Sequence, residues 1–359
     1  MTSLTIVFDA GSELETDGYY GTMHLMEHLI CKSFEHLYPK LTANGIVWNA
    51  FTSEEHIVVW FEGLSSRLTS DLKIELVKLI TGGINVEEFV FDNEKSVVHQ
   101  EYLDCVNDNT YACELNLFRK YFNDFMPIGN EQDILNFSFD DMHKQYETHF
   151  TKPVRIVEIG PDKTPELEEF CKDVQISKEH KKPKFGRYKN ELLEANTELK
   201  VPVYMVSSKI VSKSDYPFVN IGLKMLTSGL ESPFYQKLRV ESGLSYYVSG
   251  SVIKNVCGGI LSVATCTNTE RAEELCDKMR ELSDDIYKYL EPGRFEDIVN
   301  SINVQREKEK ILKYEYTSKY AGLSCLKMPN KLDKVTFDKT IYLMSRYFAD
   351  IKIIRCDKL

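Results

Sequence analysis

Residues 21–29 read Gly-Thr-Met-His-Leu-Met-Glu-His-Leu and contain the pattern His-x-x-Glu-His at His24, Glu27 and His28. Apolar residues recur around this pattern at helical spacing, which predicts a helix with Thr22 as its N-cap. Positions i and i+4 share one face of a helix, so both imidazoles can reach one metal ion. Glu27 lies close to the same face and can reach a water molecule at that ion without being a ligand.

A third ligand has to come from another element, because a catalytic zinc takes three protein ligands and keeps one position open. The helical pattern over 87–106 supplies Glu94 and Glu101, which lie about two turns apart along one stripe. Glu101 would complete the site, and Glu94 could orient a metal-bound histidine from behind. These residues predict one Zn²⁺ per chain, held by His24, His28 and Glu101.

The alternative for this motif is a chance match, since helical histidines are often only satisfied polar groups. The chain has 8 histidines, however, and two of them fall in the required register around a glutamate. That coincidence favours a metal site. The other six have no comparable spacing and no predicted role: His36, His56, His99, His143, His149 and His180.

The first half of the chain alternates strand-like and helix-like patterns, which predicts a mixed α/β domain. Predicted strands cover Ser3–Asp9, two runs within Gly45–Gly63 joined by a turn at Thr52–Glu55, and Val154–Ile159. Predicted helices lie around 66–81, 87–106, 111–124 and 138–149.

A polar, lysine-rich stretch over 163–199 separates this half from the rest and has the composition of a linker. We therefore expect a zinc-binding domain at 1–165, a linker at 166–199 and a second domain at 200–359. The order of elements in the second half roughly repeats that of the first, a weak indication of duplication. Its predicted strands are Val201–Ser207, 245–254, 258–267 and Ile351–Arg355, and its predicted helices lie within 216–242, 269–290 and 294–313.

Composition excludes several classes of function. A net charge of −11 argues against nucleic-acid binding, and the short basic stretch Lys178–Lys189 is typical of a solvated linker. Nine cysteines without a Cys-x-x-Cys pair indicate reduced thiols in a cytoplasmic protein. No signal segment or membrane span is predicted, so we expect no membrane association.

At this point the sequence resembles the pitrilysin and insulinase family of inverted zinc peptidases. In that family the His-x-x-Glu-His motif is followed by a glutamate ligand with a second important glutamate seven positions before it, and Glu101 and Glu94 match these places. Between them the family carries a Gly-x-x-Asn-Ala-x-Thr stretch; Asn49, Ala50 and Thr52 match it here, while Gly45 lies one position further from Asn49 than the pattern has it.

The resemblance continues in the second half, where residues 232–246 are similar to a family block with an arginine and a tyrosine seven positions later. Arg239 and Tyr246 have this spacing. By themselves, an Arg and a Tyr at a connection between a helix and a strand would more often be structural. Together the blocks cover nearly the whole chain, although family domains usually begin with additional strands before the one at Ser3.

The resemblance implies an α+β fold of two related domains, each a mostly antiparallel sheet covered by helices. It implies a zinc endopeptidase for short or unfolded peptides, with Glu27 as general base and Arg239 and Tyr246 assisting catalysis. It further implies that the substrate backbone pairs with an edge strand, and that the chain forms a homodimer or a heterodimer with a related subunit. The residues expected to bind substrate are Asn49, Ala50, Phe51 and Thr52.

Two other functions compete with this one. The first is a non-catalytic peptide-binding or scaffold subunit of a processing complex, since the family contains members without the zinc motif; the intact His24, Glu27, His28 and Glu101 weigh against it. The second is a zinc enzyme of the S-ribosylhomocysteine lyase type. Those lyases also carry His-x-x-Glu-His, but they are much shorter and have no Arg–Tyr block.

Overall fold

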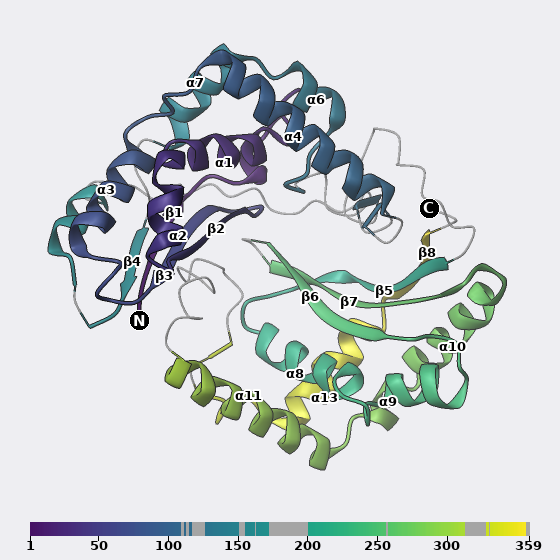
Figure 1. Ribbon diagram of the computed structural model, residues 1–359. Helices are drawn as coiled ribbons and strands as arrows, with labels where there is room; N and C mark the ends of the chain where they lie inside the picture. Colours follow the sequence, from purple (N-terminus) through teal and green to yellow (C-terminus); the bar gives the residue numbers. More distant parts are fainter. Residues whose placement is uncertain are drawn as a thin grey trace. The chain divides into compact units, whose positions relative to one another are not determined.

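The computed structural model describes residues 1–108, 111–112, 115–116, 126–150, 155–161, 163–171, 200–255, 258–312, 328–329 and 331–356. This part of the chain divides into two compact units (Figure 1). Unit one is built largely from residues 1–105 and 126–171, and unit two largely from 200–307 and 331–356. The boundaries predicted for the domains and linker stay a prediction, because most of 166–199 lies outside the described residues.

Each unit contains one four-stranded antiparallel sheet. In unit one the strand order is β2-β3-β1-β4, and in unit two it is β6-β7-β5-β8. The second, third, first and fourth strands of each unit thus follow one another in space, and this shared topology agrees with the predicted duplication. The strands are β1 (Thr2–Phe8), β2 (Val47–Thr52), β3 (Ile57–Gly63), β4 (Arg155–Ile159), β5 (Lys200–Val211), β6 (Val248–Asn255), β7 (Gly258–Asn268) and β8 (Ile351–Arg355).

Helices accompany both sheets, which confirms the predicted α+β class. In unit one they are α1 (Thr22–Lys32), α2 (Tyr38–Ala43), α3 (Ser70–Thr81), α4 (Glu88–Asn107), α6 (Glu131–Asn136) and α7 (Phe139–His149). In unit two they are α8 (Tyr216–Thr227), α9 (Pro233–Tyr235), α10 (Ala272–Asp284), α11 (Pro292–Leu312) and α13 (Phe337–Phe348). In the described part of these helices, no segment is long and apolar enough to cross a membrane.

Strand β1 explains why the sheet of unit one is stable. It lies between β3 and β4, which pair with both of its edges, and every residue of Thr2–Phe8 is buried. Leu4, Ile6 and Phe8 point to one face and are 0% exposed. The edge positions fall to β2 and β4.

The described helices add two details to the prediction and leave one part of it untested. The helical pattern over 216–242 is divided at Gly229, whose φ of 84° is left-handed, so that α8 ends before it and a new helix starts at Pro233. The predicted helix at 111–124 lies mostly outside the described residues. Helix α13 was not predicted, although Thr340, Leu343, Met344 and Tyr347 form its buried stripe.

Candidate metal centre

Helix α1 carries the two histidines on one face, as the spacing predicts. Their ring centroids lie 5.0 Å apart, and the side chains of His24 and His28 are 15% and 18% exposed. Glu101 reaches both from α4: its Oε2 is 3.4 Å from His24 Nε2, and its Oε1 is 3.7 Å from His28 Nε2. One ligand atom from each residue lies within 4.8 Å of the others. Among the described residues, this is the cluster that could hold a metal ion.

Glu94 lies on the Nδ1 side of His28 and orients its imidazole ring. The Nδ1 atom of His28 is 3.1 Å from Glu94 Oε2, and Lys32 Nζ lies 3.1 Å from the other oxygen of that carboxylate. A neutral imidazole that donates from Nδ1 to a carboxylate carries its lone pair on Nε2. Nε2 of His28 lies 3.7 Å from a carboxylate oxygen of Glu101, so a cation bound between the two atoms would contact both. The donor set therefore fits Zn²⁺.

His24 is also held in the form that binds metals. Burial, followed by the neighbouring His28, lowers the pKa of His24 to about 4, so its imidazole is neutral near pH 7. Its Nδ1 atom is buried and has no hydrogen-bond partner in the structure. The atom of His24 that faces Glu101 is Nε2, so it is the neutral imidazole beside a carboxylate and a second imidazole, not the unpartnered Nδ1, that is consistent with a metal ligand.

Glu27 lies beside the cluster and is 8% exposed. Burial raises its pKa, and the nearby Glu101 adds to this effect, whereas a hydrogen bond from Thr52 and the charge of His28 oppose it. Thr52 Oγ1 donates to Glu27 Oε2 at 2.7 Å. A carboxylate with a raised pKa is a stronger base than an ordinary glutamate, which suits a group that accepts a proton from water.

Strand β2 contains the four residues predicted to bind substrate, and the structure distributes them over its two faces. The strand lies at the sheet edge and pairs with β3, with Asn49 opposite Trp60 and Thr52 opposite Ile57. Asn49 and Phe51 are exposed, whereas Ala50 and Thr52 are half-buried. Thr52 contacts Glu27, a contact that the sequence did not predict. Substrate binding by these residues stays a prediction.

Arg239 and Tyr246 belong to unit two and are brought together there. The Arg239 guanidinium carbon lies 4.3 Å from the centroid of the Tyr246 ring, and Arg239 Nη1 donates to the Tyr246 carbonyl oxygen at 3.2 Å. The Tyr246 side chain itself is largely exposed. The sequence predicted the spacing of these two residues but not this contact, and their part in catalysis stays a prediction.

The N-terminus of α1 shows a contact that sequence reasoning missed. Thr22 is not the N-cap; the cap position is Gly21, whose φ of 95° is left-handed. The buried carboxylate of Glu15 accepts hydrogen bonds from the backbone N–H groups of Gly21 at 2.9 Å and Met23 at 2.7 Å. A carboxylate at this end is favoured by the helix dipole and anchors the turn that precedes His24. No local sequence pattern predicts the loop that brings Glu15 to the N-terminus of α1.

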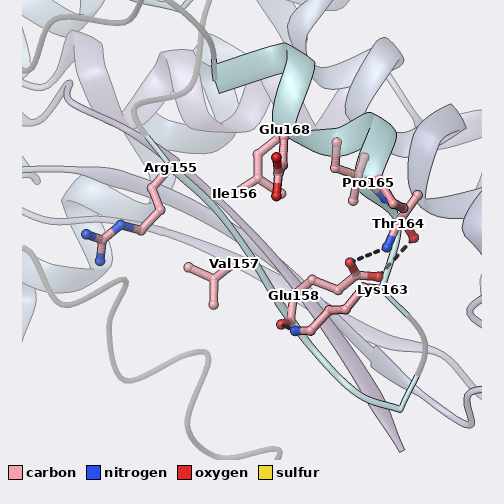
Figure 2. Close-up of a pocket in the computed structure, with 9 residues that line it drawn as sticks. Arg155, Ile156, Val157, Glu158, Lys163, Thr164, Pro165 and Glu168 are labelled. Atoms are coloured by element: carbon pink, nitrogen blue, oxygen red, sulfur yellow. Dashed lines mark hydrogen bonds between the residues drawn. The ribbon is translucent and has the colours of Figure 1, made fainter.

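A separate cavity of about 760 Å³ lies along β4, at the other edge of the sheet, and contains none of the predicted site residues. Figure 2 shows Glu158 turned towards Thr164, from whose backbone N–H it accepts a hydrogen bond at 2.7 Å, and Arg155 directed away from both. On its other side Glu158 forms an ion pair with the buried Lys73. The lining residues are Arg155, Ile156, Val157, Glu158, Lys163, Thr164, Pro165, Leu167 and Glu168.

Comparison with known proteins places this geometry in context. Residues 1–122 match the family model described as insulinase, peptidase family M16, and residues 136–302 match the model of the peptidase M16 inactive domain. The chain is 27% identical over 188 residues to a zinc protease, PqqE, of Helicobacter pylori, and 29% identical over 166 residues to the mitochondrial-processing peptidase subunit beta of Lentinula edodes. These matches cover 49% and 42% of this chain, and 40% and 34% of the two relatives.

A solved structure supports the fold over nearly the whole chain. The crystal structure of a protease from Helicobacter pylori superimposes with a TM-score of 0.74 at 17% identity, covering 99% of this chain and 93% of that one. At this identity the likeness shows the fold alone. The two family models lie one after the other along most of the sequence, and the second begins at residue 136, within unit one. The chain therefore belongs to the insulinase family of peptidases, family M16, in a form with two related α+β units.

Proposed function

We propose that this chain is a zinc-dependent endopeptidase that hydrolyses short or unfolded peptides. The observation that carries the proposal is the meeting of His24, His28 and Glu101 from two helices, with Glu27 beside them. A zinc ion held there would polarise the scissile carbonyl and lower the pKa of water to about 7. The zinc protease among the relatives supports the choice of metal.

The side chains of this chain would divide the remaining work. Glu94 keeps the His28 ring oriented through Nδ1, and Glu27 accepts a proton from the attacking water and passes it to the leaving amine. The free edge of β2 would pair with the substrate backbone, which gives affinity with little dependence on side chains. Arg239 and Tyr246 would stabilise the oxyanion. By the resemblance to the family, they would do so in the active site of a dimer partner.

The proposal is tested by metal analysis of the purified chain together with cleavage of unfolded peptides, with and without a chelator. We expect about one zinc per chain and cleavage that stops on chelation and returns with zinc. Peptide binding without cleavage by the zinc-loaded protein would instead support the non-catalytic scaffold subunit. A variant with His24→Ala and His28→Ala is the metal-free control.

Assembly and location form part of the same proposal. We propose a homodimer or a heterodimer with a related subunit, since one relative is named as the beta subunit of a processing peptidase. Sedimentation of the fully active protein as a monomer in the ultracentrifuge would contradict this assembly. A cytoplasmic location is supported by Cys31, Cys266 and Cys276, which are free thiols, as expected in a reducing compartment.

Glu94→Gln is predicted to weaken zinc binding by about 10- to 100-fold, because the amide holds the His28 ring less firmly and no longer raises its basicity. The measurement is a competition titration against a zinc chelator. Glu88→Gln is the matched control, since Glu88 is an exposed glutamate at the start of the same helix. An unchanged zinc affinity in Glu94→Gln would remove Glu94 from the site.

Thr52→Val is predicted to lower kcat about tenfold with little change in KM, because the hydroxyl that holds the Glu27 carboxylate is lost while the shape is kept. Thr52→Ser retains the hydroxyl and should stay within about threefold of the wild type. Steady-state kinetics with one fluorogenic peptide separates the two constants. A rise in KM at constant kcat would instead assign Thr52 to substrate binding, as the sequence predicted.

A further inference from the structure

A π-helical turn in unit two carries Arg239. Helix α9 ends at Tyr235 and continues directly into a π-helix over Gln236–Glu241. Wide turns of this kind are rare and often occur at functional sites, because they shift a side chain out of the regular helical register. Here Tyr235 and Arg239 lie one turn apart, and the guanidinium carbon is 5.0 Å from the centroid of the Tyr235 ring.

A second ring reaches the same guanidinium from the segment that follows the helix. The Tyr246 ring lies 4.3 Å from the Arg239 guanidinium carbon, and its carbonyl accepts a hydrogen bond from Nη1. The turn that returns the chain is closed by a hydrogen bond from Leu244 N–H to the Leu238 carbonyl, 2.8 Å, and contains Gly243 with a φ of 58°. Two tyrosines from both sides of the turn thus contact one cation.

The charge of Arg239 is left available by this arrangement. Glu241, the nearest acidic residue in sequence, forms its ion pair with Lys237 at 2.7 Å. In the described part of the chain, no carboxylate forms an ion pair with Arg239. Contact with an aromatic face attracts a cation without neutralising it or using its N–H donors. The guanidinium is therefore held in place while it keeps donors for an oxygen of a bound peptide.

We propose that Tyr235 is a positioning residue for Arg239: its ring holds the guanidinium beside Tyr246 and keeps it from turning away into solvent. The inference rests on the proposed function, in which Arg239 stabilises the oxyanion of the substrate. The hydroxyl of Tyr235 has no part in this role, because the contact is made by the ring. Tyr235→Phe should therefore keep the positioning of Arg239, and Tyr235→Leu should lose it.

Two measurements on the full-length zinc-loaded protein test the role. The first is the NMR signal of the Arg239 Nε–Hε group, which is assigned by its absence in Arg239→Lys. Ring currents of the neighbouring tyrosines displace this signal from the chemical shift of a free arginine. Tyr235→Leu should move it towards that free value by more than the missing Tyr235 ring current accounts for, because contact with the Tyr246 ring is lost as well, and Tyr235→Phe should leave it in place. The second is peptide cleavage, where Tyr235→Leu should lower kcat/KM about threefold to thirtyfold, mainly through kcat, and Tyr235→Phe should stay within about twofold of wild type.

Tyr287→Leu is the matched control, since Tyr287 is another partly exposed tyrosine of unit two that faces a cation, with Lys288 Nζ 6.0 Å from its ring. It should leave both measurements unchanged. An unmoved Arg239 signal and full activity in Tyr235→Leu would overturn the positioning role, and so would equal impairment of the Phe and Leu variants. Absence of cleavage by the zinc-loaded wild type would overturn the proposed function instead, so the two failures are distinguishable.

Discussion

Replacement of Glu27 by glutamine is expected to lower kcat by about 10²- to 10⁴-fold while zinc stays bound, because the amide has the same shape but cannot accept a proton from water. Glu27 lies beside the three proposed ligands and is held by Thr52, so the substitution leaves the donor set intact. The measurement combines peptide cleavage with zinc content. Both have to be determined on the same preparation.

Glu75→Gln is a suitable control for the Glu27 variant. Glu75 is a partly exposed glutamate of unit one that pairs with Lys40 and lies outside the metal cluster, so its loss should leave activity within about twofold of wild type. Undiminished turnover in Glu27→Gln would exclude Glu27 as the general base. Loss of zinc together with activity would make Glu27 a metal ligand.

Lys73→Met is expected to destabilise the protein by about 3–5 kcal/mol at pH 7, because it leaves the Glu158 carboxylate buried without its counter-charge. Lys73 is 1% exposed on α3, and the Glu158 side chain is 9% exposed on β4. Urea unfolding measures the loss. Lys40→Met, which breaks the exposed pair with Glu75, should cost less than about 1 kcal/mol and serves as the control.

The same ion pair predicts a pH dependence. Burial alone would raise the pKa of Glu158, but the hydrogen bonds from Lys73 and Thr164 outweigh it and hold that pKa below its ordinary value. A group whose pKa is lower in the folded state stabilises the fold above its unfolded pKa, about 4.3 for glutamate, and this contribution is lost as the pH falls through the folded pKa. The stability difference between wild type and Lys73→Met should therefore shrink below about pH 4.

The double variant Lys73→Met with Glu158→Gln distinguishes this explanation from a simple packing defect. The glutamine amide is uncharged and can still accept the hydrogen bond from the Thr164 backbone. The double variant should therefore recover part of the stability lost in Lys73→Met. A double variant that is less stable than the single one would show that the cost lies in packing around Lys73 and not in the unpaired charge.

The sequence by itself determined the elements and the motif on which the site is built. The spacing of His24 and His28 requires one helical face, and the alternation of Ser3–Asp9 requires a strand, because both follow from local backbone geometry. The position of Glu101 relative to the histidines was inferred from a candidate helix and supported by the family resemblance. The structure places its carboxylate within 3.4 Å and 3.7 Å of the two Nε2 atoms.

Only the tertiary structure decided which distant side chains support the site. The hydrogen bond from Thr52 to Glu27 depends on how α1 packs on β2, and the cap of Glu15 on the α1 N-terminus depends on the path of the preceding loop. The contact of Tyr235 with Arg239 depends on a π-helical turn that periodicity does not reveal. Such contacts arise from packing and loop closure, which involve the whole unit, whereas motif spacing is set within a few residues of the chain.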